Sequence, residues 1–92
     1  MPEPFSPPDA RTRIREVLAT GAVVFSRHAI AELRADGLSR NDAIAVLRGG
    51  VVEPAEFESG SWRYRMRAQR VYVVVAFRSD VELIVVTGWR LK

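Results

Sequence analysis

The stretch that decides the fold is residues 61–67, which read Ser61-Trp62-Arg63-Tyr64-Arg65-Met66-Arg67. Large apolar side chains and arginines alternate strictly along it, and a period of two is that of a β-strand with two unlike faces. Two apolar runs follow, at residues 71–77 and 83–87, with almost no polar residue on either face. Such runs are typical of interior strands, so the C-terminal part of the chain predicts three consecutive strands.

The length and the composition point to one small domain. A chain of 92 residues can build a single core. It has no cysteine and one histidine, so we expect neither disulfides nor a zinc site, and no other cofactor. No apolar run reaches the roughly 20 residues of a membrane span, and the first residues lack the pattern of a signal peptide. We therefore expect a cytoplasmic protein that does not bind membranes.

The charge of the chain is carried mainly by arginine. The net charge is +3, and 13 of the 14 basic residues are arginines. Arginine keeps its charge and offers a planar fork that suits phosphate, so this balance is compatible with a nucleic-acid or acidic partner. Codon bias in a GC-rich genome would produce the same composition. The charge alone does not identify a partner.

The N-terminal part predicts an irregular lead and a helix. Four of the five prolines fall in residues 1–8, which predicts a disordered or extended lead before a single domain at residues 9–92. A helix capped by Ser6 or Asp9 is expected to run to about Thr20. Its apolar side chains lie on one side, as in a helix that rests on a sheet.

Two further helices are predicted before the strands begin. Residues 22–25 form a short strand or an extended link, and Ser26 then caps a helix that closes near Gly37. Ser39 caps a third helix, which ends at residues 49–50. Because the link between these two helices is short, they form a helical hairpin that must pack on the sheet.

The strands are expected to form a four-stranded antiparallel meander. Residues 51–58 resemble a fourth strand, placed at an edge because Pro54 cannot donate to the ladder. Turns at residues 59–60 and 68–69 would join the strands, placing Arg65 beside Tyr72. The predicted class is therefore α+β: an antiparallel four-stranded sheet with the helical hairpin on one face and an extra N-terminal helix.

These registers define two faces, because side chains two positions apart share a face. The first, on which the hairpin is expected to dock, carries Trp62, Tyr64, Met66, Val71, Val73, Val75 and Phe77. The second carries Arg63, Arg65, Arg67 and Arg70 around Tyr72, with Val74, Ala76 and, from the closing strand, Leu83, Val85, Thr87 and Trp89. We expect the first helix to shield part of the second face and to leave an apolar patch beside Arg65 and Arg67 that binds another protein.

The arginine row is the strongest candidate binding site. Arginines along one strand face recur about every 6.6 Å and can follow a phosphate backbone, while Tyr72 offers a surface for base stacking. The alternative is cross-strand pairing with Glu53, Glu56 and Glu58. Of these pairs, Glu56 with Arg63 is the clearest, and Arg65 and Arg67 have no equally obvious acidic partner.

His28 is the one side chain that ordinarily titrates near neutral pH, so it is a candidate proton carrier. Glu32 follows it by one helical turn. The alternative is therefore an ordinary surface ion pair between these two side chains.

Three short motifs carry a family resemblance. They are Phe25-Ser26-Arg27-His28-Ala29, then Gly37-Leu38-Ser39 with Asp42, and Ile84-Val85-Val86-Thr87-Gly88-Trp89-Arg90. Together, over residues 23–90, they resemble a family of small bacterial domains of unknown function. That family is similar to the RelE/ParE toxin fold, whose relatives include the BrnT and MqsR toxins.

The resemblance implies a metal-independent endoribonuclease of a type II toxin–antitoxin pair. The catalytic candidates are His28, which matches the family pattern, and Tyr72 and Arg65, which come from the sheet analysis. The RNA-binding candidates are Arg27, Thr87 and Arg90, which match the pattern, and Arg63, Arg65, Arg67 and Arg70 on the sheet. The implied partners are RNA, including ribosome-bound mRNA, a cognate antitoxin, and a second copy in a homodimer. The alternative is a non-enzymatic RNA- or protein-binding module that uses the arginine face.

Overall fold

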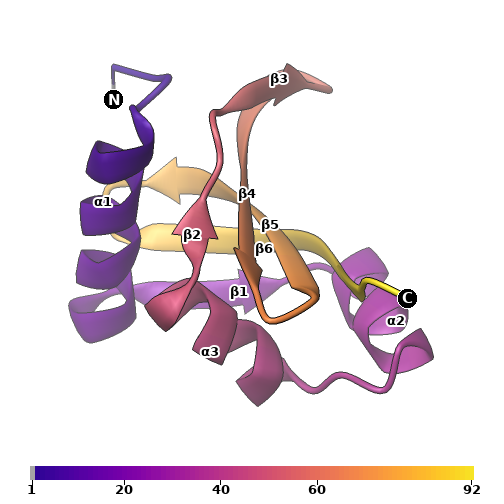
Figure 1. Ribbon diagram of the computed structural model, residues 1–92. Coiled ribbons are helices and arrows are strands. Elements are labelled where there is room, and N and C mark those ends of the chain that lie inside the picture. Colours follow the sequence, from indigo (N-terminus) through magenta and orange to yellow (C-terminus); the bar gives the residue numbers. More distant parts are fainter. Residues whose placement is uncertain (1) are drawn as a thin grey trace.

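The computed structural model describes residues 2–92 and confirms an α+β architecture (Figure 1). Its helices are α1 (Pro7–Thr20), α2 (Arg27–Ala35) and α3 (Arg40–Gly49). Its strands are β1 (Ala22–Phe25), β2 (Val51–Val52), β3 (Glu56–Glu58), β4 (Ser61–Ala68), β5 (Val71–Ser79) and β6 (Glu82–Arg90). None of the helices in this range is long and apolar enough to cross a membrane.

The sheet has six strands and is mixed. The predicted antiparallel succession is present, because β2 and β3 pair with β4, β4 with β5 and β5 with β6, but a purely antiparallel sheet of four strands is wrong. The strand order is β1-β6-β5-β4-β2, and β3 pairs with β4 as well. β1 runs parallel to β6, whereas the other pairs are antiparallel. A parallel partner requires a long crossover connection, and the chain between β1 and β6 supplies one through two helices and the other strands.

Residues 51–58 do not form one continuous strand. Pro54 separates β2 from β3, and both short strands pair with β4. The predicted turn at residues 59–60 is confirmed, because Glu56 lies opposite Arg63. The break follows from the missing N–H of proline, which cannot join the ladder.

The register of β4 on β5 differs from the predicted one by two residues. The turn lies at Gln69 and Arg70, whose φ angles are 51° and 89°, so Arg65 lies opposite Val74 rather than Tyr72. Positive φ at both central residues is typical of a type I′ turn, which asparagine and glycine usually signal. A shift of two leaves every side chain on its predicted face.

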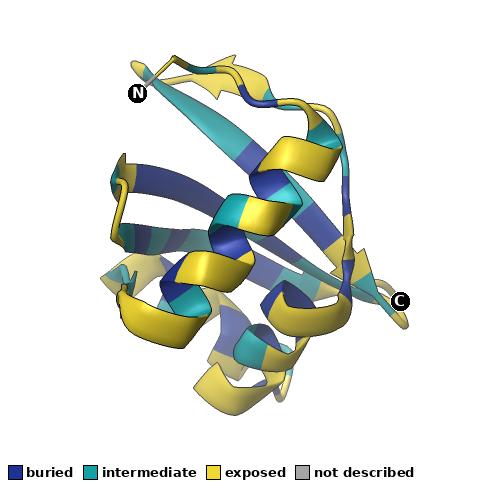
Figure 2. Ribbon diagram, turned by 90° about the vertical axis from the view of Figure 1, so that its left-hand side faces the viewer, coloured by how far each residue is buried: buried dark blue, intermediate teal, exposed yellow. Residues whose placement is uncertain are grey.

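The first face of the sheet is the core. Of the predicted residues, Tyr64, Met66, Val73, Val75 and Phe77 are buried, and Trp62 and Val71 pack against them. The helices contribute Ile14 and Val17 from α1, Ala29 and Leu33 from α2, and Ala43 and Leu47 from α3. Their outer sides are exposed (Figure 2). All three helices therefore pack on one face, and the prediction that the first helix shields part of the second face is wrong.

The N-terminal lead, residues 2–6, has no regular secondary structure, and it packs onto the core. Helix α1 begins at Pro7, where the missing N–H of proline costs nothing, and Ser6 caps it. Phe5 is 4% exposed, and its ring meets the rings of Tyr64 and Phe77. The burial of this aromatic ring holds the N-terminal lead in place, although its prolines prevent regular secondary structure. Met1 lies outside the described residues.

A bulge in the last hairpin reverses the expected facing of two residues. Val74 lies opposite Thr87, but the next residue, Val75, lies opposite Val85, so the ladder skips one residue of β6. Such an extra residue changes the phase of the alternation. Leu83 and Val85 therefore lie in the core, fully buried, and their predicted place on the second face is wrong. Thr87 and Trp89 keep their predicted side, opposite Val74 and Tyr72.

Tyr64 holds the N-terminal lead against the sheet. Its buried hydroxyl accepts a hydrogen bond from the Phe5 N–H at 3.0 Å and donates one to Oε2 of Glu3 at 2.8 Å. Burial raises the pKa of Tyr64 to about 12 from its ordinary value of 10.0. The stability that depends on the neutral phenol is therefore fully present below pH 10 and is lost as the pH rises through about 12.

Replacing Tyr64 by phenylalanine is expected to lower the free energy of unfolding at neutral pH by about 1–3 kcal/mol, because the Phe5 N–H loses its partner inside the core. The variant should also lose the part of the alkaline destabilisation that comes from this phenol. Urea denaturation of both proteins between neutral pH and about pH 11 measures both effects. Equal stability and an unchanged pH profile would contradict this role of Tyr64.

Candidate functional site

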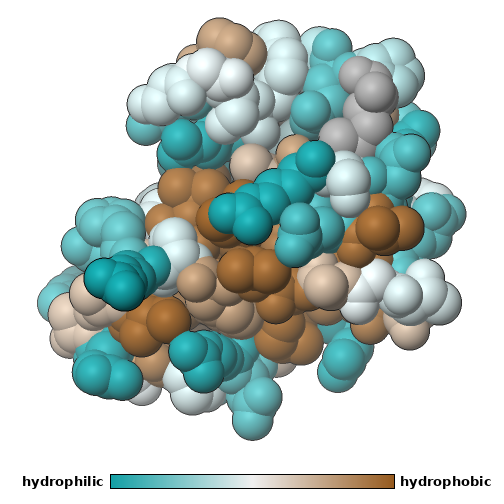
Figure 3. Space-filling view, turned by 180° about the vertical axis from the view of Figure 1, so that it is seen from behind, coloured by the Kyte–Doolittle hydropathy of each residue, from teal (hydrophilic) through white to brown (hydrophobic). Residues whose placement is uncertain are grey.

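The second side of the sheet carries no helix, and we call it the open face. It is made of Arg63, Arg65 and Arg67 from β4, Tyr72 and Val74 from β5, and Thr87 and Trp89 from β6. None of these side chains is fully buried. A view from behind shows apolar side chains reaching the surface with hydrophilic ones across and around them (Figure 3). Apolar and cationic groups are therefore both accessible to a ligand.

Two aromatic rings and one guanidinium form a stack on the open face. The rings of Tyr72 and Trp89, on neighbouring strands, lie 5.2 Å apart between centroids at an interplanar angle of 14°. The guanidinium carbon of Arg65 lies 5.9 Å from the centroid of the Tyr72 ring. This is within the range of a cation–π contact. The arrangement confirms that Arg65 and Tyr72 are neighbours, although the register that was expected to bring them together is different.

A groove of about 220 Å³ lies beside this stack. It is lined by Glu56, Glu58, Arg63, Arg65, Val74, Thr87 and Trp89. The fold thus brings together three of the predicted RNA-binding residues, Arg63, Arg65 and Thr87, from strands that are not all adjacent. Carboxylates share the groove with these cations, so its charge is mixed.

Acidic partners hold two of the arginines, contrary to expectation. Arg65 lies 2.9 Å from a carboxylate oxygen of Glu56 and 3.5 Å from one of Glu53, and Arg67 lies 3.6 Å from the other oxygen of Glu53. The Glu53 N–H donates to the Arg65 carbonyl at 2.9 Å, which places the Glu53 side chain beside both arginines. The prediction of one continuous strand at residues 51–58 did not indicate that Glu53 lies beside both arginines.

Of the three arginines of β4 on the open face, Arg63 is the one whose charge is not balanced by an acidic partner. Its Nε donates to the hydroxyl of Ser61 at 3.2 Å, and among residues 2–92 it forms no ion pair. The predicted pair with Glu56 is absent, because that carboxylate turns to Arg65. Arg63 is therefore the cation of the groove that is most available to an anionic ligand.

The candidate proton carrier His28 is not part of the groove. Its side chain is 67% exposed on α2, and its Nε2 lies 3.9 Å from Glu32. Helix α2 belongs to the helix layer, where Ala29 and Leu33 contact the core. The structure therefore does not place His28 with Arg65 and Tyr72, and its recorded contact is that of the surface ion pair. Arg27, beside it, is also exposed on α2.

The remaining predicted arginines make contacts near the C-terminus. Arg70 lies in the β4–β5 turn and donates from Nε to the Leu91 carbonyl at 3.2 Å. The Arg90 N–H donates to a carboxylate oxygen of Asp36 at 2.8 Å, and Lys92 lies 3.4 Å from the other oxygen. The hydrogen bond from Arg90, supported by Lys92, lowers the pKa of Asp36. The contacts of Asp36 therefore join the end of β6 to the end of α2, and the contact of Arg70 joins the β4–β5 turn to the residue that follows β6.

Comparison with protein-family models, with curated proteins and with solved structures finds no match to this chain. In the part of the chain that the structure describes, no group of three or more histidine, aspartate or glutamate side chains is placed to hold a metal ion.

Proposed function

We propose that the open face binds single-stranded RNA and that the protein is a toxin-like RNA-binding protein with a RelE/ParE-like fold. The observation that supports this most is the groove in which Arg63, Arg65 and Thr87 meet the Trp89 ring. Single-stranded RNA is recognised by bases stacked on aromatic side chains and by cations along the backbone. The open face supplies both groups on one rigid sheet.

A sheet surface suits this task because strands hold side chains at fixed spacing. Trp89 and Tyr72 already stack on each other, so a base that joins the stack meets a rigid surface and little side-chain freedom is lost. Arg63 lies in the same groove without an ion pair and reaches the backbone phosphate of the stacked nucleotide. A base on Trp89 and a phosphate on Arg63 are the two anchors of the proposed complex.

Metal-independent cleavage of the bound RNA is the second candidate. In this reaction the 2′-oxygen attacks the adjacent phosphorus, its proton passes to a base, and the P–O5′ bond breaks as an acid protonates the leaving oxygen. Cations stabilise the charge that develops on the phosphate. The neighbouring Arg65 and Tyr72 favour this candidate, and a cognate antitoxin would be the partner that covers the groove.

Binding is tested with labelled single-stranded RNA and fluorescence anisotropy. Replacing Trp89 by alanine is expected to weaken binding by about 1–3 kcal/mol, or roughly 5–150-fold, through the loss of one stacking surface. Arg63→Ala is expected to weaken it as well. Arg15→Ala, an exposed arginine on α1, is the control and should bind like the wild type. If all three variants bind equally, the open face is not the RNA site; circular dichroism confirms that each is folded.

Cleavage is tested with the same RNA, with and without EDTA. The catalytic candidate predicts EDTA-resistant products that carry a 2′,3′-cyclic phosphate and a 5′-hydroxyl. These products should disappear in Tyr72→Phe and Arg65→Ala and persist in His28→Ala, since His28 lies outside the groove. Binding without any product would leave the non-enzymatic RNA-binding module as the function.

A further inference from the structure

A cleft lies in the helix layer where α2 meets α3, and we call it the α2–α3 cleft. It has a volume of about 330 Å³ and is lined by Ile30, Leu33, Arg34, Leu38, Ser39 and Arg40. Leu33 and Leu38 are almost fully buried and Ile30 is half-buried, so the inner wall of the cleft is aliphatic. The volume is at the lower end of the about 300–1,000 Å³ that is usual for ligand sites, so the cleft suits a small molecule.

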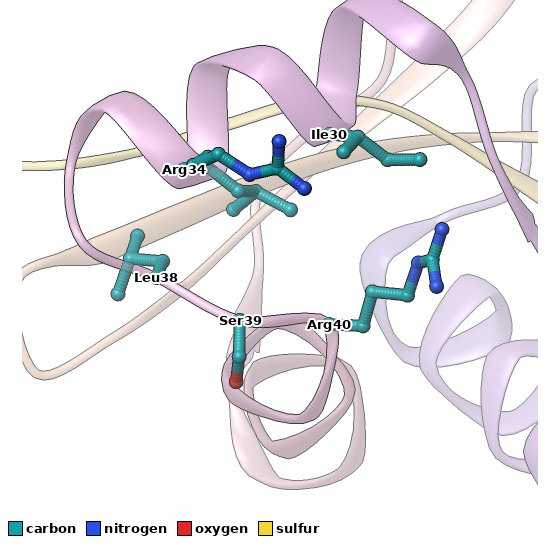
Figure 4. A pocket seen from close by; sticks show the side chains of 6 residues that line it. Ile30, Arg34, Leu38, Ser39 and Arg40 are labelled. Atoms are coloured by element: carbon teal, nitrogen blue, oxygen red, sulfur yellow. The ribbon is translucent and has the colours of Figure 1, made fainter.

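Two guanidinium groups at the mouth of this cleft have no acidic partner. Arg34 and Arg40 are exposed and form no ion pair with any residue of the described range 2–92. One comes from each helix, and both extend toward the Ile30 side of the cleft (Figure 4). The guanidinium carbon of Arg40 also lies 5.8 Å from the centroid of the Phe25 ring, a cation–π contact that orients the side chain without neutralising its charge. An anion that enters the cleft therefore meets two cations.

The other polar groups of the lining are already engaged. The Ser39 hydroxyl accepts a hydrogen bond from the Asp42 N–H at 3.1 Å and donates one to the Asp42 carboxylate at 3.0 Å. At the end of α2, the Arg34 carbonyl accepts from the Gly37 N–H at 3.0 Å. The side-chain groups that remain free are guanidinium groups, which donate hydrogen bonds and accept none. A ligand that carried an ammonium group would place another unpaired cation beside them, so the lining selects an acceptor with negative charge.

From these features we propose that the α2–α3 cleft binds a small organic acid, which is a carboxylate on an apolar body without an ammonium group. Its carboxylate oxygens accept hydrogen bonds from Arg34 and Arg40, because the planar guanidinium fork matches the geometry of a carboxylate. Its hydrocarbon body lies on Ile30, Leu33 and Leu38 and leaves water, which favours binding in proportion to the apolar area covered. Because α2 and α3 lie on the other side of the sheet, this site is separate from the open face.

A second depression in the helix layer has the same charges without the aliphatic wall, and we call it the α1–α3 hollow. Its volume is also about 330 Å³, and it is lined by Arg15, Leu18, Ala19 and Arg48. Both arginines are exposed and form no ion pair among residues 2–92. Its apolar lining consists of a half-buried leucine and an exposed alanine. The hollow therefore serves as an internal control for binding by charge alone.

Titration of isotope-labelled protein with hexanoate, followed by the amide resonances, tests the proposal without RNA. The amides of Arg34, Leu38 and Arg40 are expected to shift and to saturate with a Kd of about 1 mM or lower, which is within the usual affinity per atom of small ligands. Those of Arg48 and Trp89 should not shift. Butyrate should bind more weakly, by about fourfold for each methylene removed. Hexanol lacks the charge, phosphate lacks the chain and aminohexanoate adds an ammonium group, so each should bind at least about tenfold more weakly than hexanoate.

A pair of charge-matched variants locates the site. Arg34→Gln/Arg40→Gln is expected to bind hexanoate at least about tenfold more weakly and to remain folded, since both side chains are exposed. Arg15→Gln/Arg48→Gln, which lowers the net charge equally, should bind it like the wild type. Absence of shifts around the α2–α3 cleft, shifts centred on the α1–α3 hollow, or undiminished binding by Arg34→Gln/Arg40→Gln would each overturn the proposal. So would phosphate or aminohexanoate that binds as tightly as hexanoate.

Discussion

Replacing Leu33 by alanine is expected to lower the free energy of unfolding by about 2–5 kcal/mol. The side chain is 2% exposed and lies between α2 and β6, the strand on which this helix packs. Its removal loses the transfer free energy of the deleted atoms and leaves a cavity that a sheet-bound helix cannot easily close. A domain of this size is stable by only about 5–15 kcal/mol, so the loss is a large fraction of the total.

Urea denaturation measures this loss, and the protein supplies a control of the same chemistry. Leu91 is 46% exposed, so Leu91→Ala should change the free energy of unfolding by less than about 0.5 kcal/mol. If Leu33→Ala were as mild as Leu91→Ala, helix α2 would not be docked on β6 as described.

Gly88 explains how α2 can approach β6 so closely. A Cβ added there would lie 2.7 Å from Cδ2 of Leu33 and 3.1 Å from the Tyr72 carbonyl oxygen. Gly88→Ala should therefore cost about 1–3 kcal/mol by overpacking. In the Leu33→Ala background the new methyl group finds space, so the double variant should be less destabilised than the sum of the two single variants. Additive losses would show that the two residues do not share this contact.

The local features of the fold were predictable because short segments encode them. The alternation in residues 61–67 assigned the two faces of β4, and serines at positions 26 and 39 marked where α2 and α3 begin. The partner of β1 was not predictable in this way. Its pairing with β6 joins residues far apart in the chain, and nothing in four apolar residues indicates the direction of the neighbouring strand.

The bulge in β6 is a second feature that could not be predicted from the sequence pattern. Residues 83–86 are all apolar, so their pattern contains no phase that could indicate which of them face the core. The phase is set by packing under the helices, which selects Leu83 and Val85. Pattern reasoning therefore placed these two residues on the wrong face, while Thr87 and Trp89, beyond the bulge, were placed correctly.

The candidate site was predictable in its residues but not in its charge balance. The arginines of β4 and Tyr72 share the open face as expected, because a period of two survives a register shift of two. The ion pairs to Glu53 and Glu56 depend on how the chain bends at Pro54, and that bend is a property of the folded backbone. His28 also needed the structure, since its distance from the sheet face depends on the docking of α2.

Removing the carboxylates that hold the arginines is expected to strengthen RNA binding, whereas removing the arginines weakens it by at least about a hundredfold. Each arginine–phosphate contact contributes about 1.5–3 kcal/mol, so Arg65→Ala/Arg67→Ala should lose at least about 3 kcal/mol. Glu53→Gln/Glu56→Gln should bind more tightly than the wild type, because RNA no longer competes with carboxylates at 2.9–3.6 Å for the same guanidinium groups. These exposed ion pairs contribute about 0–1 kcal/mol to folding, so the glutamine variant remains folded.

A salt titration and a charge-matched variant separate local competition from the effect of net charge. A plot of the logarithm of the binding constant against the logarithm of the salt concentration has a negative slope, to which each phosphate contact with a single strand contributes about 0.7. For the double arginine variant this slope should be shallower by roughly 1.4. Glu16→Gln/Glu32→Gln removes two exposed carboxylates on the helices and changes the net charge as Glu53→Gln/Glu56→Gln does. If the two glutamine variants tighten binding equally, the gain comes from overall charge. If neither does, Arg65 and Arg67 do not contact the phosphates, and the ion pairs of the open face only support the sheet.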